Sequence, residues 1–316
     1  MPNYKLIVQI LKYCLKLIFS YLIINLGGIF FLKQLFRNKT SLLIVNYHNF
    51  SKYNNYKIKR GNILETGYAD NFEKQIRFYK KHFNFCCPEE FFEGKCAKGI
   101  NVFITFDDGY KDNYDIALPI LKKYKAAVVF FITTNFIGSN NWLWHDQVRY
   151  LVAIGKINVD EAEYQLKRMN QDFPVDGAFK NKVETLFQKA PRRLMMNWGE
   201  VKQLASNGFL IGAHTANHKV LSSLDKNEQQ DEIERSLNAI NQNLSIQSVH
   251  FAFPNGLYNQ STLDTLSSNK IKYAYTTISG FNQTKNNSKM RLKRIGINAS
   301  DTIGVILLKL LRSIKK

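Results

Sequence analysis

The segment Val102–Tyr110, VFITFDDGY, decides the fold prediction. Its first five residues are almost wholly apolar, which is typical of a strand buried in a parallel sheet. Two carboxylates, Asp107 and Asp108, follow directly, and Gly109 lets the backbone turn sharply after them. Because parallel α/β sheets place their functional sites at the carboxyl ends of strands, the segment predicts a core strand and a candidate site.

Short apolar runs alternate with amphipathic segments on both sides of this segment. Helices are predicted over residues 71–83, 114–124, 197–208 and 225–244. Strands are predicted over residues 41–50, 102–106, 126–133, 209–213, 249–253, 272–277 and 291–297. This alternation indicates a parallel sheet covered by helices, and six or so such units favour a β/α barrel over two half-size domains.

The 316 residues leave room for one large domain with additions. We expect this domain to span residues 41–300, with a polar, helical insertion at about 140–196. Residues 1–40 form a hydrophobic and basic N-terminal segment, and residues 301–316 form a basic, amphipathic C-terminal helix. A domain of this size needs no disulfide framework, so the four cysteines receive no predicted role.

The chain is strongly basic, with 44 Lys and Arg against 25 Asp and Glu and a net charge of +19. Such a charge favours anionic partners, although a Lys-rich composition alone would produce the same excess. The sequence contains no zinc-finger spacing, RNP-like string or basic-leucine heptads, so we predict no nucleic-acid partner.

Both ends of the chain suggest a membrane surface. Residues 17–32 carry no charge and are flanked by basic residues, but these 16 residues are fewer than a comfortable span needs. A short anchor, an interfacial helix and a buried helix all stay open for them. An apolar stripe over residues 303–314 fits either a packed last helix or a lipid contact. Together the ends predict membrane association in a bacterial cell envelope, on either side of the membrane.

A second polar cluster, His214–His218 (HTANH), follows the predicted strand 209–213. Its two histidines converge if the segment coils into a helical turn. Combined with Asp108 they would leave coordination positions open, which describes a catalytic metal site with a spare carboxylate beside it. Each cluster alone has a simpler interpretation, an Asx-capped turn for the first and surface histidines for the second.

TFDDGY followed about a hundred residues later by HTANH resembles the polysaccharide deacetylase family, also known as carbohydrate esterase family 4 or the NodB homology domain. The resemblance covers roughly residues 41–297. It implies a distorted (β/α)7 barrel that removes N-acetyl groups, usually from N-acetylglucosamine units of a polymer. It also implies that Asp107 is the general base and that Asp108, His214 and His218 bind the metal.

The third family motif, usually Arg-x-Pro followed by an aromatic residue, is altered here. Residues 252–255 read AFPN, so Ala252 replaces the arginine that normally steadies the base. The backbone N–H of Asn255 is the candidate oxyanion donor, because a main-chain donor survives a side-chain change.

The fifth family motif normally supplies a histidine as general acid. Residues 292–297, LKRIGI, contain none. His250, on the side of its strand expected to face the barrel, is one candidate, and His48 and His145 are the others.

The chain is most similar to a branch associated with exopolysaccharide export. Its Tyr47–His48 pair matches a Tyr-His pair that precedes the barrel there, and residues 142–146 (WLWHD) match a Trp-rich segment. Tyr110, Trp144 and His48 are therefore candidate substrate contacts, with packing as the alternative for the tryptophan.

These features predict a metal-dependent hydrolase that removes N-acetyl groups from amino sugars of an exported or cell-surface polysaccharide, or of a lipid-linked glycan. Zinc is the default metal for a nitrogen-rich ligand set, with cobalt, nickel, iron and manganese open. The altered motifs motivate an alternative, a catalytically weak protein of this fold that binds glycan or a biosynthetic partner.

Overall fold

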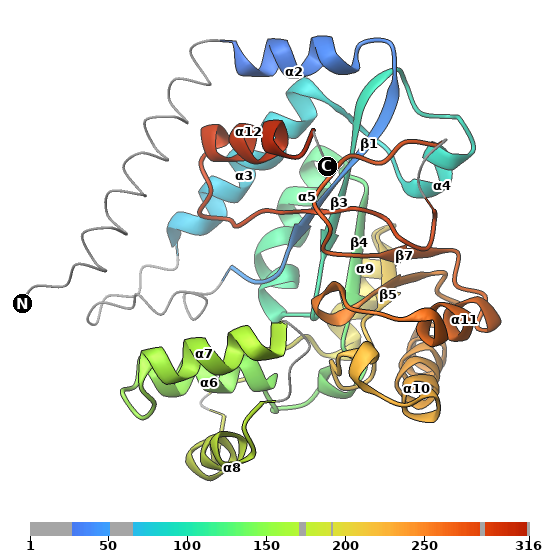
Figure 1. The fold of residues 1–316 in the computed structure, drawn as a ribbon. Helices are drawn as coiled ribbons and strands as arrows, with labels where there is room; N and C mark the ends of the chain where they lie inside the picture. The colour runs from blue at the N-terminus through green and yellow to red at the C-terminus, as the bar shows by residue number, and fades with distance from the viewer. Residues whose placement is uncertain (1–26, 51–65, 171–174, 191, 285–287, 315–316) are drawn as a thin grey trace, which may run out of the picture.

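A single curved parallel sheet lies at the centre of the molecule (Figure 1). The computed structural model describes residues 27–50, 66–170, 175–190, 192–284 and 288–314. The strand order is β7-β6-β5-β4-β3-β1-β8, with β2 paired to β3 as an additional strand. The strands are β1 (Thr40–Tyr47), β2 (Asn84–Phe85), β3 (Gly99–Phe106), β4 (Val128–Ile132), β5 (Leu210–Ala213), β6 (His250–Ala252), β7 (Tyr273–Tyr275) and β8 (Ile295–Gly296).

The last segment of the sheet joins its two edges. Leu292 forms a parallel bridge to Tyr275 of β7, and three residues later Ile295 pairs with Val45 of β1. The chain around β8 therefore lies between the first and last strands and closes the sheet. The predicted distorted (β/α)7 barrel is confirmed.

Side-chain alternation along the strands produces two apolar layers, because successive residues of a strand point to opposite faces. One layer lies between the sheet and its helices, and Leu43, Val45 and Val102 belong to it. The other fills the barrel interior: Leu42, Ile44, Phe103, Val129, Phe131, Ala252, Tyr273, Tyr275 and Leu292. The near-continuous apolar runs in the sequence reflect strands that are buried on both faces.

Helices cover the outer face of the sheet (Figure 1). They are α2 (Gly28–Phe36), α3 (Thr66–His82), α4 (Pro88–Phe92), α5 (Leu118–Tyr124), α9 (Trp198–Ser206), α10 (Lys226–Leu244), α11 (Gln260–Ser268) and α12 (Ile303–Arg312). Short irregular turns are η2 (Asn113–Ala117), η3 (Thr134–Phe136), η4 (Leu221–Ser223) and η5 (Pro254–Gly256). Capping boxes begin α9 at Asn197 and α10 at Asp225, where the predicted helices 197–208 and 225–244 start.

The predicted helical insertion is a three-helix unit beyond the carboxyl ends of β1 and β3 (Figure 1). It consists of α6 (Trp144–Ala153), α7 (Val159–Asn170) and α8 (Gly177–Leu186). Val148, Leu151, Ala162 and Val183 form part of its own small apolar core. The insertion is therefore held together by its own burial and covers one end of the barrel.

The predictions for the two ends of the chain have different outcomes. Most of the predicted hydrophobic run 17–32 lies outside the described residues, and only its last part appears, in α2. The C-terminal helix α12 packs against α2 and α3 and buries Val305, Ile306 and Leu310, so its apolar stripe faces the protein. Within the described ranges, no helix combines the length and apolarity needed to cross a membrane.

Candidate active site

The two polar clusters converge at the carboxyl ends of β3 and β5. The Asp108 Oδ1 atom lies 3.4 Å from His214 Nε2 and 3.2 Å from His218 Nε2. One ligand atom from each of these residues lies within 4.8 Å of those of the other two. The structure thus brings together the three predicted metal ligands, about a hundred residues apart in the chain, with Asp107 adjacent to them.

Left-handed backbone, rather than a helical turn, shapes both motifs. Asp108 has a φ of 78° and Gly109 a φ of 91°, and a Cβ on Gly109 would meet Ile137 at 2.9 Å, so only glycine fits there. Thr215 and His218 have φ values of 62° and 58°. The expected helical turn over HTANH is wrong: two unusual backbone conformations turn its histidines toward the same carboxylate.

The donor set fits a divalent cation. Asp108 Oδ1 is buried without a hydrogen-bond partner. The Nδ1 of His214 lies 2.8 Å from the Ala252 carbonyl, which can only accept, so Nδ1 carries the proton and Nε2 presents its lone pair toward Asp108. An ionised carboxylate and two imidazole nitrogens are ligands that zinc accepts.

Asp107 is held by a buried arginine. Arg294 Nη1 donates to Asp107 Oδ1 at 2.7 Å, and Asn46 Nδ2 donates to Oδ2 at 3.0 Å. Arg294 is itself fixed by donation from Nε to the Thr276 carbonyl at 2.8 Å. Burial acts to raise the pKa of Asp107, but its neighbours, Arg294 first among them, outweigh burial and lower that pKa. Asp107 is therefore an ionised, oriented carboxylate, as a general base requires.

A family model described as polysaccharide deacetylase matches residues 94–274, more than half of the chain. The chain belongs to the polysaccharide deacetylase family. The match begins before β3 and ends within β7, so it includes both motifs of the site.

Individual relatives agree with this assignment. The poly-β-1,6-N-acetyl-D-glucosamine N-deacetylase of Staphylococcus epidermidis is 35% identical over 122 residues, which cover 35% of this chain and 42% of that protein. The chain thus matches less than half of that curated relative's length. The Streptococcus pyogenes deacetylase PplD, solved in complex with acetate, superposes with a TM-score of 0.58 at 21% identity, covering 87% of this chain and 99% of that one. IcaB from Ammonifex degensii gives 0.55 at 16% identity, with 86% and 97% covered, and both structures share the fold.

Arg294 is the site residue that sequence reasoning missed. Ala252 stands where the family usually has the arginine. The expectation for residues 292–297 concerned the general-acid histidine of the fifth motif and not an arginine. The structure supplies the guanidinium from that segment instead, on the same side of the chain as Leu292, which lies in the barrel interior. A charged residue two positions after an inward leucine in a predicted strand was the available signal.

Two of the three candidate acids, His48 and His250, lie at opposite ends of the barrel. His48 Nε2 lies 3.9 Å from Asp107 Oδ2, and its side chain is 49% exposed at the mouth of the site. His250 faces the barrel, as its strand parity predicted, but at the opposite end of the strands: Nε2 lies 2.8 Å from Glu89 Oε1 and Nδ1 2.9 Å from the Tyr275 hydroxyl. His250 does not reach Asp107, which argues against it as the acid.

Two adjoining cavities open onto the catalytic groups, and His48, His218 and Asn255 line both. The smaller, of about 210 Å³, is bounded also by Asp107, His214, Phe253 and Thr277. The larger, of about 350 Å³, is bounded also by Asp108, Tyr110, His145, Arg149, Leu166, Met169 and Asn298. The insertion therefore supplies one wall of the larger cavity through α6 and α7.

The aromatic candidates have different surroundings. Tyr110 lines the larger cavity, and its hydroxyl donates to Asp146 at 2.7 Å and lies 3.0 Å from His145 Nε2. Burial raises the pKa of Asp146 to about 6. Trp144 lines neither cavity and packs against Phe179 inside the insertion, with ring centroids 6.1 Å apart. Trp144 therefore packs inside the insertion, and Tyr110 links the barrel to the insertion.

Asn255 lies where the altered third motif meets the insertion. It adopts a left-handed φ of 56° in the short turn η5. Its side chain donates to the Met169 carbonyl at the end of α7, and its own carbonyl accepts from Thr277 Oγ1 at 3.2 Å. The turn is therefore held on two sides, and its residue Asn255 lines both cavities.

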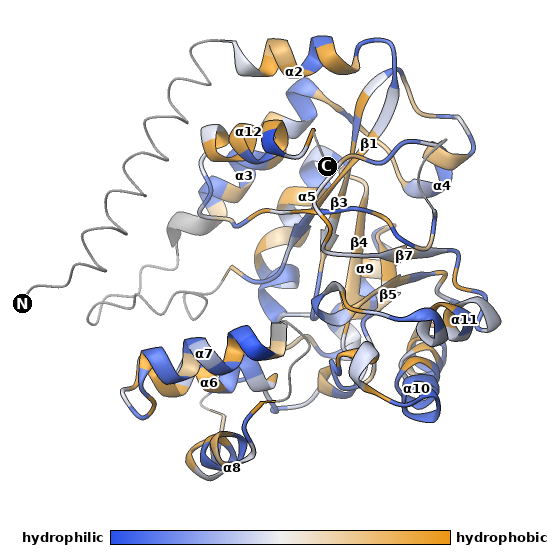
Figure 2. Cartoon of the chain, in the orientation of Figure 1, coloured by the Kyte–Doolittle hydropathy of each residue, from blue (hydrophilic) through white to orange (hydrophobic). Residues whose placement is uncertain are grey.

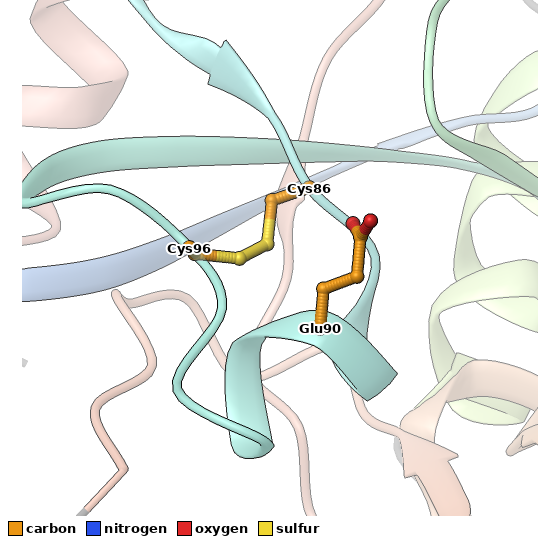
Figure 3. Close-up of side chains that lie close together, drawn as sticks. All are labelled: Cys86, Glu90 and Cys96. Carbon is orange, nitrogen blue, oxygen red and sulfur yellow. A yellow bond between two sulfur atoms is a disulfide. The ribbon is translucent and has the colours of Figure 1, made fainter.

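A second group of potential metal ligands lies elsewhere, beside α4 (Figure 3). Cys86, Glu90 and Cys96 approach one another there, but the two cysteines form a disulfide. The Glu90 carboxylate accepts from the Cys87 backbone N–H at 3.0 Å in a capping box. These residues serve structure, and the disulfide is a feature that the sequence analysis did not predict.

Proposed function

We propose that this protein is a metal-dependent N-deacetylase acting on N-acetylated amino sugars of an exported or cell-surface polysaccharide. The observation that carries the proposal is an ionised Asp107, clamped by Arg294 and Asn46, beside the Asp108, His214 and His218 cluster. A protein that only bound glycan would not need a buried, oriented carboxylate adjacent to a metal site. Arg294 beside Asp107 and His48 at the cavity support the hydrolase over the binding alternative.

Each residue around the cavity has a place in the hydrolysis of an acetamide. A divalent cation held by Asp108, His214 and His218 would polarise the acetyl carbonyl and acidify the attacking water. Asp107 accepts the proton of that water as its oxygen attacks the carbonyl carbon. The backbone N–H of Asn255 is the candidate donor to the developing oxyanion. His48 donates a proton to the nitrogen as the C–N bond breaks, which releases acetate and a free amine.

The substrate class follows from the cavities and the relatives. Polar groups line much of the space around His48 and Arg149, and a volume of about 350 Å³ is within the range of small-ligand sites. The staphylococcal relative is named for a β-1,6-linked N-acetylglucosamine polymer, which makes oligomers of that linkage the first substrate to test. Zinc is the proposed cation because two of the three ligands are imidazoles.

We also propose a cell-envelope location. The basic, largely apolar residues 1–40 support membrane association. The Cys86–Cys96 disulfide favours an oxidising compartment, outside the cytoplasmic membrane.

Acetate release from β-1,6-linked N-acetylglucosamine oligomers tests the activity, with and without a chelator. We expect release by the wild type, loss after chelation and recovery on addition of Zn²⁺. Asp107→Asn should lower the rate by about 10²–10⁴-fold while metal content is unchanged, because the variant loses the base but keeps the ligands. Failure of the metal-loaded wild type to release acetate from any N-acetylated glycan would overturn the proposal.

A further inference from the structure

A large cavity of about 480 Å³ lies at the amino ends of the strands, away from the catalytic groups. It is bounded by the end of α2, the end of α3 and the start of β3: Lys33, Gln34, Arg37, Lys80, Lys81, His82, Phe83, Asn84, Lys98, Gly99 and Ile100. Five of these residues are lysine or arginine, and among the described residues that bound the cavity none is acidic. We call this feature the basic cavity.

The helix beside the basic cavity exposes large apolar side chains. Phe30, Phe31 and Leu35 of α2 are 65%, 57% and 41% exposed, whereas Leu32 and Phe36 are buried against the barrel. Figure 2 shows hydrophobic and hydrophilic residues side by side on α2. An apolar surface of this kind on the outermost helix has no covering element within the described part of the chain.

The exposed face of α2 carries an apolar stripe along one side and a basic stripe along the other, with Phe30 next to the basic stripe. Phe31 and Leu35 are one helical turn apart, and so are Lys33 and Arg37. The second pair bounds the basic cavity, where it is joined by exposed lysines from α3 and from the loop before β3. Aromatic and aliphatic side chains beside clustered Lys and Arg are the composition of helices that lie in the headgroup layer of a membrane.

We propose that this amino-end surface, the exposed face of α2 together with the basic cavity, docks the protein on an anionic lipid bilayer. Phe30, Phe31 and Leu35 enter the interfacial layer, and lipid phosphates occupy the basic cavity. Charge complementarity selects this occupant, because uncompensated lysines and arginines are attracted to anionic headgroups and gain nothing from a neutral surface.

Docking of this surface sets the orientation of the active site. Strand β3 begins at Gly99 on the basic cavity and ends at Phe106, immediately before Asp107. Its eight residues span roughly 23 Å, so the catalytic cavities face away from the bilayer. This inference about orientation rests on the proposed function. The outward orientation favours, as the substrate, a polymer that has left the membrane over a sugar that is still linked to lipid.

Co-sedimentation of the full-length protein with vesicles tests the docking step. The vesicles contain either phosphatidylcholine alone or equal parts of phosphatidylcholine and phosphatidylglycerol. The test variant neutralises four residues of the basic cavity: Lys33→Gln, Arg37→Gln, Lys80→Gln and Lys98→Gln. A matched control neutralises four exposed lysines on other faces: Lys167→Gln, Lys180→Gln, Lys202→Gln and Lys226→Gln.

The test variant should bind the anionic vesicles at least about tenfold more weakly than the wild type, and the control within about twofold of it. Added salt should weaken binding of the wild type more than that of the test variant. Equal binding by the test and control variants would overturn the proposal, because bulk charge would then explain the attraction. Equally tight binding of the wild type to neutral vesicles would also overturn it.

Acetate release from soluble oligomers tests the orientation. Vesicle-bound wild type should work at the rate of the unbound protein, and a strong loss of rate on binding would overturn the outward orientation. If no form of the protein releases acetate but vesicle binding still depends on the basic cavity, the proposed function fails and the docking surface stands.

Discussion

The two ends of the barrel handle charge in opposite ways. At the carboxyl end, Asp107 and Asp108 are buried, and each has a cationic or imidazole partner within 3.5 Å. At the amino end, the cations of the basic cavity lie at the surface without acidic neighbours lining it. A buried charge must be compensated inside the protein, whereas an exposed charge is solvated and stays available to an outside partner. On our proposals, the first end performs the chemistry and the second attaches the protein to the membrane.

The largest expected effect comes from removing a ligand at the carboxyl end. Asp108→Ala leaves two imidazoles without their carboxylate, so we expect loss of bound metal and a fall in acetate release of more than about a thousandfold. Metal analysis and an acetate assay would measure both. The matched control Asp264→Asn changes an exposed carboxylate on α11 and should leave both unchanged. Full metal content in Asp108→Ala would contradict the ligand assignment.

Arg294→Met tests the compensation of a buried charge. The substitution leaves the buried Asp107 carboxylate without its cationic partner, so the free energy of unfolding should fall by about 3–5 kcal/mol in urea titrations. The rate of acetate release should fall as well, because the pKa of Asp107 rises. The double variant Arg294→Met with Asp107→Asn should recover part of the lost stability, since the unpaired charge of Asp107 is then removed. Stability of the single variant equal to that of the wild type would show that Arg294 does not balance Asp107.

A pair of histidines compares the two ends directly. His48→Gln should lower the rate by about 10²–10⁴-fold with little effect on stability, because the side chain is half exposed and is the proposed acid. His250→Gln should leave the rate within about twofold and lower stability by about 1–3 kcal/mol, because it disturbs the buried contacts with Glu89 and Tyr275. Acetate assays and urea titrations of both variants decide this. The reverse pattern would move the acid to His250.

The last expected effect concerns the pH dependence of stability and Asp112, which follows the catalytic turn. Burial raises the pKa of Asp112 to about 7, while its carboxylate accepts from the Phe50 backbone N–H at 2.7 Å. The folded state therefore prefers the protonated form, and the wild type loses stability as pH rises from about 4 to about 7. Asp112→Asn removes this loss and keeps an acceptor for Phe50. Relative to the wild type, it should be more stable at pH 8 than at pH 4, by up to about 4 kcal/mol, as measured by urea midpoints. A wild-type pH dependence retained in the variant would contradict this.

Local patterns carried most of the fold prediction. The apolar runs at residues 41–50 and 102–106 became β1 and β3, and the capping boxes at Asn197 and Asp225 began α9 and α10. Such signals are legible because they depend on neighbours in the sequence. The position of His250 was not predictable in this way. The alternation of side chains along its strand correctly predicted that His250 faces the barrel interior. Its level along the barrel axis depends on the pairing of β6 with β7.

The amino-acid sequence by itself determined the strand-and-helix order, the family and the residues Asp107, Asp108, His214 and His218, because these are properties of short segments and their spacing. Only the tertiary structure decided that Arg294 clamps the base, that His48 and not His250 stands at the cavity, and that Cys86 bonds Cys96. Each of these contacts joins separate segments that meet only when the barrel closes or a loop folds back. The register of that closure depends on the packing of the whole sheet and not on any local pattern.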